Sequence, residues 1–365
     1  MISFELTEEQ NAIREAVGEF AVGVMQPLAR DCDETSSVPE DFLGQVWELG
    51  LTTTQVPEAF GGLGAPRSPV TNAVVLEELA RGDAGLAVAA TVPSLFVNAV
   101  LDHGTDDQKK RLLPALCGDR FATGSLAVVE PGAMPDAARP TTAAEAHNGG
   151  YRLSGTKRLV PFADRATHFL VVASADDGPG VFIVERDASG LSIESEPDKN
   201  LGLRAVPTHT LTLSGVEVSA SDRLGGSEGC DVRTLLDGSR TAIAACLVGI
   251  SRAVLDYCVP YAKDRVAFDE AIAKKQAIAF LLAESHMEVE AMRWLTWQAA
   301  SLLERGENAT KAAFQAWSYA GEKGMWVSDN GIQVLGGHGF IREHPVELWF
   351  RHARTLGVLE GTASI

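Results

Sequence analysis

Basic residues are scarce in this sequence. Its 365 residues include 31 Lys and Arg against 49 Asp and Glu, which gives a formal net charge of −18 at pH 7. Nucleic acids are bound by a basic face, so this deficit argues against a nucleic-acid partner. It does not exclude a polyphosphate ligand, because a few arginines or backbone N–H groups are enough to hold one.

Paired cysteines are also missing. The five cysteines are scattered, odd in number and never spaced as Cys-x-x-Cys, which is typical of reduced thiols in a cytosolic protein. The acidic start of the chain lacks the basic and apolar regions of a signal peptide. The apolar run at 84–92 is too short to cross a membrane and ends at Pro93. These absences predict a cytoplasmic protein with no membrane partner.

Nucleotide-binding and metal-binding fingerprints are absent from the sequence too. No Gly-x-Gly-x-x-Gly follows a predicted strand and no Walker sequence occurs, so a Rossmann or P-loop domain is not expected. The GlyGlyLeuGly at 61–64 lacks the strand–turn–helix context and indicates only a turn. His338, His344 and His352 lie close together, but their spacing does not match a metal-ligand pattern. We therefore expect no metal site.

The sequence does contain a helix–strand–helix order, in a chain long enough for two or three domains. Residues 1–118 are predicted to be helical, with Thr7 opening a capping box and Thr105 as a second N-cap. Short β-branched runs split by Gly, Asp and Pro in 119–223 predict an antiparallel barrel or sandwich. Long periodic apolar runs in 224–365 predict packed helices.

A single carboxylate near the end of the chain is a candidate catalytic group. Glu360 follows Leu356, Val358 and Leu359 and precedes Gly361. A carboxylate in apolar surroundings suits a base that must remove a weakly acidic proton. From its position alone, Glu360 could equally be a surface residue near a C-terminus.

The stretch from Gln333 to Thr362 resembles the last part of the acyl-CoA dehydrogenase family. It contains Gln-x-x-Gly-Gly-x-Gly, then Pro-Val-Glu, Arg-x-Ala and a final Glu-Gly-Thr. Earlier motifs, Pro-Glu-x-x-Gly-Gly-Leu-Gly and Gly-Thr-x-x-Gln-Lys, match the N-terminal domain of that family. The resemblance covers essentially the whole chain. It implies an α+β fold with an N-terminal α-helical domain (1–118), a central antiparallel β-barrel domain (119–223) and a C-terminal four-helix-bundle domain (224–365).

The same resemblance implies a reaction. Members of the family use FAD to dehydrogenate an acyl-CoA thioester between its α and β carbons, as in fatty-acid β-oxidation, and pass the electrons to an electron-transfer flavoprotein. This chemistry needs a base for the α proton and donors to the thioester oxygen. It also needs an organic cofactor, because no side chain accepts hydride. Glu360 matches the catalytic base of the family, and Gly361 beside it matches a position at the substrate.

Two neighbouring positions near 240 bear on that assignment. Some relatives carry the base on an earlier helix, directly before an Arg, where this chain has Ser239. A hydroxyl cannot serve as this base, so Glu360 is the only candidate. Arg240 itself matches a substrate-contacting Arg of the family. By spacing alone, Arg240 would instead be a surface residue that pairs with Asp237 at i and i+3.

A second group of residues matches FAD-binding positions of the family. The Arg of ArgValAlaPhe at 265–268 matches one that binds the FAD pyrophosphate of a neighbouring subunit, a role that suits a bidentate guanidinium. Asp269 replaces a family Gly in this segment. The turn after the last long helix resembles the part that reaches the adenosine end of the same FAD. The resemblance therefore implies a homotetramer, with cofactor contacts from Arg265, Phe268, Gln276, Gln333, Gly336, Gly337 and Thr362.

The strand region departs from the family pattern where the flavin is expected to lie. Val129, after Val128, stands in place of a family Thr. Leu159 and Pro161 replace the Trp and Thr of a Trp-Ile-Thr contact, and Pro161 has no N–H to donate. Met134 and Pro135 replace a Gly and a Ser that approach flavin and substrate. The expected flavin contacts are therefore Val128, Val129, Leu159 and Pro161.

These departures leave two interpretations open. In the first, the chain is a divergent enzyme that builds the same FAD site from other groups. In the second, it is a non-catalytic or half-site subunit of a heterotetramer, and it completes the FAD site of a paralogous chain. The altered side chains at the flavin favour the second interpretation, and Glu360 favours the first.

Overall fold

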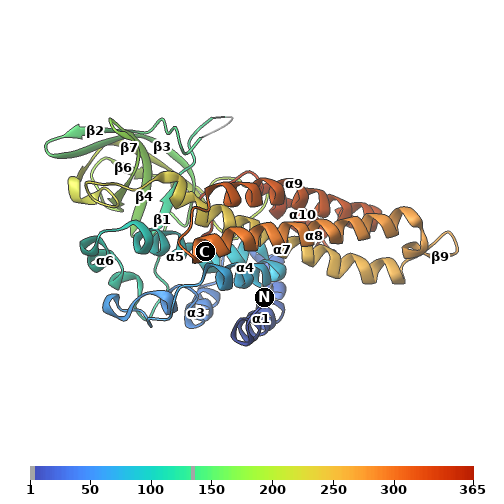
Figure 1. Cartoon of the computed structure of the whole chain (residues 1–365). Coiled ribbons are helices and arrows are strands. Elements are labelled where there is room, and N and C mark those ends of the chain that lie inside the picture. The colour runs from blue at the N-terminus through green and yellow to red at the C-terminus, as the bar shows by residue number, and fades with distance from the viewer. Residues whose placement is uncertain (1–4, 133–135) are drawn as a thin grey trace.

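The computed structural model of the chain describes residues 5–132 and 136–365, so Met134 and Pro135 lie outside the described residues. Figure 1 shows a block of helices, a sheet at one end of the molecule, and a long helical bundle that extends away from the sheet. These parts follow the order of the chain: helices, then strands, then helices. The α+β architecture expected from the sequence is confirmed.

The N-terminal helices begin where the sequence predicts helix caps. Thr7 and Thr105 each accept a hydrogen bond from the backbone N–H three residues on, and the Gln at that position bonds back, so both form capping boxes. Asp83 caps a third helix by accepting from the backbone N–H of Leu86. The helices of this part are α1 Glu8–Phe20, α2 Gln26–Thr35, α3 Glu40–Glu48, α4 Pro69–Gly82, α5 Ala84–His103 and α6 Asp106–Leu112.

Helix α5 corrects the sequence prediction, because the apolar run does not end at Pro93, which lies inside the helix. Burial of nearly every side chain of α5 outweighs the roughly 3 kcal/mol that an internal proline costs.

By length and composition, α5 and α7 (Val232–Asp264) could each cross a membrane, contrary to the expectation that no run reaches that length. In this fold, 94% and 72% of their most apolar windows are buried.

The strands form one seven-stranded sheet in the order β1-β4-β2-β3-β7-β6, with β5 paired to β4. Most pairs are antiparallel, but β1 runs parallel to β4 and β2 is parallel to β4 at one residue pair, so the sheet is mixed. The prediction of a wholly antiparallel domain was wrong on this point, because side-chain alternation reports the buried face and not the direction of the partner strand. The strands are β1 Ser125–Ala127, β2 Ala143–His147, β3 Gly150–Pro161, β4 His168–Ala175, β5 Gly178–Glu185, β6 Leu191–Ile193 and β7 Thr208–Ser219.

The C-terminal helices pack around α7, which contacts α4, α8 and α9 along its length. α7 is 33 residues long and most of its apolar residues are buried. It leads into a two-stranded hairpin of β8 (Val266–Ala267) and β9 (Glu270–Ala271), which lies at the tip of the bundle, far from the sheet (Figure 1). The other helices of the bundle are α8 Gln276–Glu304, α9 Thr310–Leu335 and α10 Val346–Leu356.

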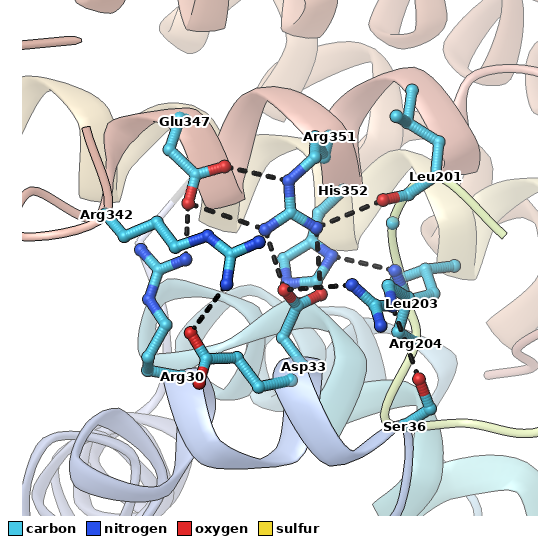
Figure 2. Close-up of polar contacts among 12 residues, drawn as sticks. Arg30, Asp33, Ser36, Leu201, Leu203, Arg204, Arg342, Glu347, Arg351 and His352 are labelled. Carbon is cyan, nitrogen blue, oxygen red and sulfur yellow. Dashed lines mark hydrogen bonds and ion pairs between the residues drawn. The ribbon is translucent and has the colours of Figure 1, made fainter. Parts of the chain in front are cut away.

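An ion-pair network fastens α10 to the N-terminal helices (Figure 2). Arg351 of α10 donates to both carboxylate oxygens of Asp33 on α2, at 2.8 and 2.7 Å, and its Nε donates to Glu347 at 2.8 Å. Arg30 of α2 donates to the same Glu347. Burial alone would raise the pKa of Asp33, but the hydrogen bonds and charge of Arg351 outweigh it and the pKa is lowered.

The next residue of α10, His352, makes a second buried connection. Its Nδ1 accepts from the backbone N–H of Leu203 at 2.9 Å, so its Nε2–H is left to donate to Asp83, at 3.1 Å. His352 and Asp83 are both almost fully buried. Through these contacts α10, which precedes Glu360, is bonded to α2, to the cap of α5 and to the loop before β7.

Candidate active site

Glu360 lies in a turn just after α10 and is paired with an arginine from α7. The Nε of Arg240 donates to Glu360 Oε1 at 2.7 Å, and the two side chains are only 14% and 16% exposed. The pairing joins residues that are 120 positions apart in the sequence. Arg240 therefore contacts the candidate base itself, and the described contacts do not include the pairing with Asp237 that helical spacing suggested.

Gly361, the residue after Glu360, packs between α7 of the bundle and the segment that follows β1 of the sheet. Gly361 has a φ of +72°, a conformation that favours glycine, and its N–H donates to the Oγ of Ser239 at 3.0 Å. A Cβ at Gly361 would lie 2.9 Å from Cγ2 of Val128, which follows β1. Ser239, which cannot act as a base, thus has a structural part in the site, and Val128, Arg240, Glu360 and Gly361 are brought together as predicted site residues.

One turn before Arg240, α7 carries a buried acid. Asp237 is 2% exposed, and its Oδ2 accepts from the Oγ1 of Thr310 at 2.8 Å. Its Oδ1 has no hydrogen-bond partner among the described residues. Burial raises the pKa of Asp237 to about 6, against the opposing effects of the Thr310 hydrogen bond and the charge of Arg240. The site therefore keeps one carboxyl that is costly to ionise close to one that is held by a guanidinium.

A cavity of 620 Å³ adjoins the site on the side of Ser239. Its volume is in the range of small-molecule sites. Asp237, Ser239, Leu126 and Ser364 are among the residues that line it, whereas Glu360 and Arg240 are not part of its described lining. The cavity is thus lined by Ser239, the neighbour of Arg240 in the chain, and not by the Glu360–Arg240 ion pair itself.

At three of the expected flavin-contact residues, a backbone group is already hydrogen-bonded within the chain. The carbonyl of Val129 accepts from the N–H of Arg158 at 2.8 Å. Leu159 has a φ of +56°, and its N–H donates to Asp198 at 3.2 Å. The carbonyl of Pro161 accepts from the Oγ of Ser125 at 2.6 Å. The apolar side chains at 129, 159 and 161 therefore offer a flavin surfaces for contact and no hydrogen-bonding groups of their own.

A buried ion pair holds the segment that contains Val128 and Val129. Lys157 on β3 is fully buried, and its Nζ donates to Glu130 at 2.7 Å and to the carbonyl of Val128 at 3.3 Å. Burial alone would raise the pKa of Glu130, but hydrogen bonds, first from Lys157, lower it to about 2. Sequence reasoning missed this pair, because the strand predicted there ends at Lys157, whereas in the structure β3 continues to Pro161 and the lysine inside it needs a buried partner.

The second group of predicted residues lies at the other end of α7. Arg265 follows the last residue of the helix and is exposed. Phe268 is 87% exposed in the β8–β9 turn, and both Phe268 and Asp269 have positive φ values, 54° and 68°. Gln276 begins α8 and is also exposed. A large aromatic side chain that is held out into solvent on a turn is available to contact another molecule.

The turn after α9 joins this second group. Gln333, Gly336 and Gly337 are exposed, and the next residue, His338, is bonded at Nδ1 to the hydroxyl of Tyr261, 3.0 Å away near the end of α7. Helical rise places Arg240 about 36 Å from the end of α7. The predicted residues thus form two groups at opposite ends of one helix, too far apart to hold the same end of one ligand.

Several features of the second group and of the C-terminal turn fit a phosphate-bearing cofactor such as FAD. A Cβ at Gly336 or Gly337 would meet nothing within 4 Å among the described residues, so a ligand can approach this backbone closely. Thr362, by contrast, is close to Glu360, and its buried Oγ1 has no partner among the described residues. An unpaired buried hydroxyl is costly unless a ligand or water satisfies it. Arg265 adds an exposed guanidinium that suits a pyrophosphate.

Three family models match: the acyl-CoA dehydrogenase N-terminal domain at residues 7–120, the middle domain at 125–216 and the C-terminal domain at 230–365. The mitochondrial short-chain specific acyl-CoA dehydrogenase of Bos taurus is 34% identical, over 100% of this chain and 89% of that protein. The probable acyl-CoA dehydrogenase fadE25 of Mycobacterium leprae is also 34% identical, over 99% of this chain and 94% of that protein.

A solved structure extends the comparison to three dimensions. Butyryl-CoA dehydrogenase from Megasphaera elsdenii superposes with a TM-score of 0.89 at 29% identity, covering 99% of this chain and 96% of that one. Together with the matched domains, this confirms the resemblance and the fold class predicted from the sequence, and it identifies the chain as an oxidoreductase. The chain belongs to the acyl-CoA dehydrogenase family, and FAD is its cofactor.

Proposed function

We propose that the protein dehydrogenates an acyl-CoA thioester between its α and β carbons, with Glu360 as the base. The observation that carries this proposal is the pairing of Glu360 with Arg240 where α7, the end of β1 and the C-terminal segment meet. This charge-assisted hydrogen bond fixes the position of the Glu360 carboxylate at that junction, and a base must be held in reach of the proton that it removes.

The roles of the chain's own groups follow from that geometry. Arg240 binds Glu360 Oε1, so Oε2 is the oxygen that takes the proton from the α carbon. The electron pair of that C–H bond forms the new double bond as the β hydrogen leaves with its pair as hydride. Bound FAD supplies the acceptor for this hydride. Gly361, fixed by Ser239, holds the turn that orients Glu360 toward the substrate.

The far end of α7 points to a second copy of the chain. Arg265, Phe268 and Gln333 are exposed and lie about one helix length from Glu360, so they serve the FAD of a neighbouring subunit rather than their own. Exposed Phe280 and Met287, seven residues apart on α8, supply apolar surface for subunit contact. We propose, as the family resemblance implies, that the protein is a homotetramer in the cytoplasm and transfers its electrons to an electron-transfer flavoprotein.

A second candidate function is that of a half-site subunit in a heterotetramer. It is favoured by Val129, Leu159 and Pro161, because their side chains offer the flavin no hydrogen bonds and one backbone group of each is already bonded within the chain. Such a subunit would hold FAD poorly alone and would complete the site of a paralogous chain. The intact Glu360–Arg240 pair favours the enzyme.

One preparation distinguishes the two functions. The protein is expressed alone, its FAD content per chain is measured, and acyl-CoAs of several chain lengths are added without oxygen while the flavin absorbance is followed. The proposed enzyme bleaches its flavin, and Glu360→Gln slows the bleaching by about 10²–10⁴-fold without changing FAD content, because only the basic oxygen is lost. Bleaching of Glu360→Gln at the wild-type rate contradicts the role of Glu360. A chain that holds little FAD until a paralogue is co-expressed is the half-site subunit.

A further inference from the structure

Two aromatic side chains on α9 flank the arginine that binds Glu360. The guanidinium carbon of Arg240 lies 5.6 Å from the ring centroid of Phe314 and 5.8 Å from that of Trp317. Both distances are within the range of a cation–π interaction. Phe314 and Trp317 are three residues apart, so they share one face of the helix, and their centroids are 5.8 Å apart. Arg240 is therefore held on one side by a carboxylate and on another by two rings.

The exposure of the two rings argues against a role in core packing alone. Phe314 is 49% exposed, which is unusual for a residue whose only task is to fill a core. Trp317 is partly buried, and its buried Nε1 has no hydrogen-bond partner among the described residues, an arrangement that is costly for a residue that only fills a core. The contact that the two rings share is the guanidinium of Arg240.

The Glu360–Arg240 pair needs such support. An arginine side chain has many rotamers, and a partly exposed ion pair has little intrinsic preference for a single geometry. A second acid lies near the same guanidinium, because Asp237 is one turn away on α7; burial raises the pKa of Asp237, and the charge of Arg240 opposes that rise. Aromatic faces attract the cation without donating or accepting a proton, so they fix Arg240 and leave the base free to react.

We infer that Phe314 and Trp317 are positioning residues that hold Arg240 against Glu360 and so set the orientation of the base. The inference rests on the proposed function of Glu360. It differs from the role of Arg240 that the family resemblance implies, since an arginine that binds only substrate would not need two rings to direct it toward the carboxylate. The two roles predict different kinetics.

The test compares Leu substitutions at the two rings. Phe314→Leu and Trp317→Leu each lower kcat by about 2- to 30-fold, the rate equivalent of one cation–π contact, and leave KM for the best acyl-CoA within about twofold. Trp317→Phe retains a ring face and keeps most of the wild-type kcat. Trp326→Leu is the matched control: Trp326 is also partly buried on α9 and its ring lies 5.9 Å from Lys323. It leaves kcat unchanged.

Two kinetic results overturn the inference. A rise in KM at unchanged kcat means that the rings act through substrate binding, and an equal loss of kcat in Trp326→Leu means that they only stabilise α9.

Crystal structures of the wild type and of the Phe314→Leu, Trp317→Leu double variant supply a readout that needs no turnover. We expect Arg240 to leave Glu360 in the double variant, and an ion pair retained in the wild-type geometry contradicts the positioning role. If the wild type oxidises no acyl-CoA, the proposed function fails, and the structures still decide the role of the rings.

Discussion

The two ends of α7 differ in the kind of residue that each displays. At the first end, Arg240 and Asp237 are buried or nearly so, and they bond to groups from α9 and the C-terminal turn. At the other end, Arg265 and Phe268 extend into solvent. The side chains at the first end are held by bonds within the chain, whereas those at the far end are exposed and free to contact another molecule. One helix thus separates what the subunit does for itself from what we propose it does for its neighbour.

The largest expected effect on activity comes from placing a defect at the first end of α7 in one chain and a defect at the far end in another, and then co-expressing the two. A Glu360→Gln subunit lacks the base but has an intact far end, and an Arg265→Ala subunit has the base but a damaged far end. If the far end serves the partner, a mixed oligomer contains sites with both the wild-type base and the wild-type arginine. Random assembly of equal amounts gives about one fully wild-type site in four, so we expect co-expression to restore roughly a quarter of the wild-type activity at limiting FAD, although Glu360→Gln alone loses about 10²–10⁴-fold.

The control for this experiment is a mixture of the two variants assembled separately. Subunits that do not exchange give only the sum of two weak activities. If the co-expressed oligomer shows only this summed activity, each chain supplies Arg265 to its own FAD. The two ends of α7 would then serve the same subunit.

A smaller effect is expected at the far end alone. Arg265→Ala removes a charge-assisted contact to phosphate, which is worth on the order of 1.5–3 kcal/mol and corresponds to about a 10- to 150-fold rise in the Kd for FAD. Equilibrium dialysis measures this change. Lys263→Ala is the matched control, because Lys263 is an exposed cation two residues earlier in the chain. Equal losses in both variants would point to the net charge of the helix end rather than to a specific contact.

The smallest expected effect is a pH-dependent gain in the stability of the protein when Asp237, at the first end of α7, is replaced by Asn. Burial raises the pKa of Asp237 to about 6, so its ionisation above that pH costs the folded state up to about 3 kcal/mol. This cost disappears as the pH falls from about 6 toward 4, which is near the pKa of Asp237 in the unfolded chain. In that range the folded state takes up the proton while the unfolded state is still ionised. Asp237→Asn should therefore raise the Tm at pH 7 and have little effect at pH 4. A gain that is the same at both pH values would show that the charge of Asp237 is not its cause.

Local features of the fold could be predicted from the sequence, and its long-range features could not. The capping boxes at Thr7 and Thr105 depend on residues three apart, and both were found where expected. The helical course of α5 through Pro93 was missed, because tertiary burial overrides the local preference of proline. The parallel pairing of β1 with β4 joins strands more than forty residues apart, and no local pattern encodes its direction.

The candidate site divides in the same way. Glu360 and the far-end residues were named because a whole motif resembles a family, which carries long-range information that periodicity lacks. Arg240 was assigned to the substrate from the same resemblance, and its bond to Glu360 is visible only when the chain is folded. Phe314 and Trp317 gave no signal in the sequence, since aromatic residues on a helix are ordinary core residues until an arginine is found between their rings and a carboxylate.

The connections of α10 have a consequence for how the protein comes apart. Arg351 is bonded to α2, and His352 is bonded both to the cap of α5 and to the loop before β7, so this C-terminal helix, which precedes Glu360, is attached to the N-terminal helices and to the middle part of the chain. Opening α10 alone would remove Arg351 from the buried carboxylate of Asp33 and His352 from that of Asp83, which is costly for buried acids. Its amide hydrogens should therefore exchange with solvent only when the whole subunit unfolds, as members of a single cooperative unit, while those of the β8–β9 hairpin exchange through local openings.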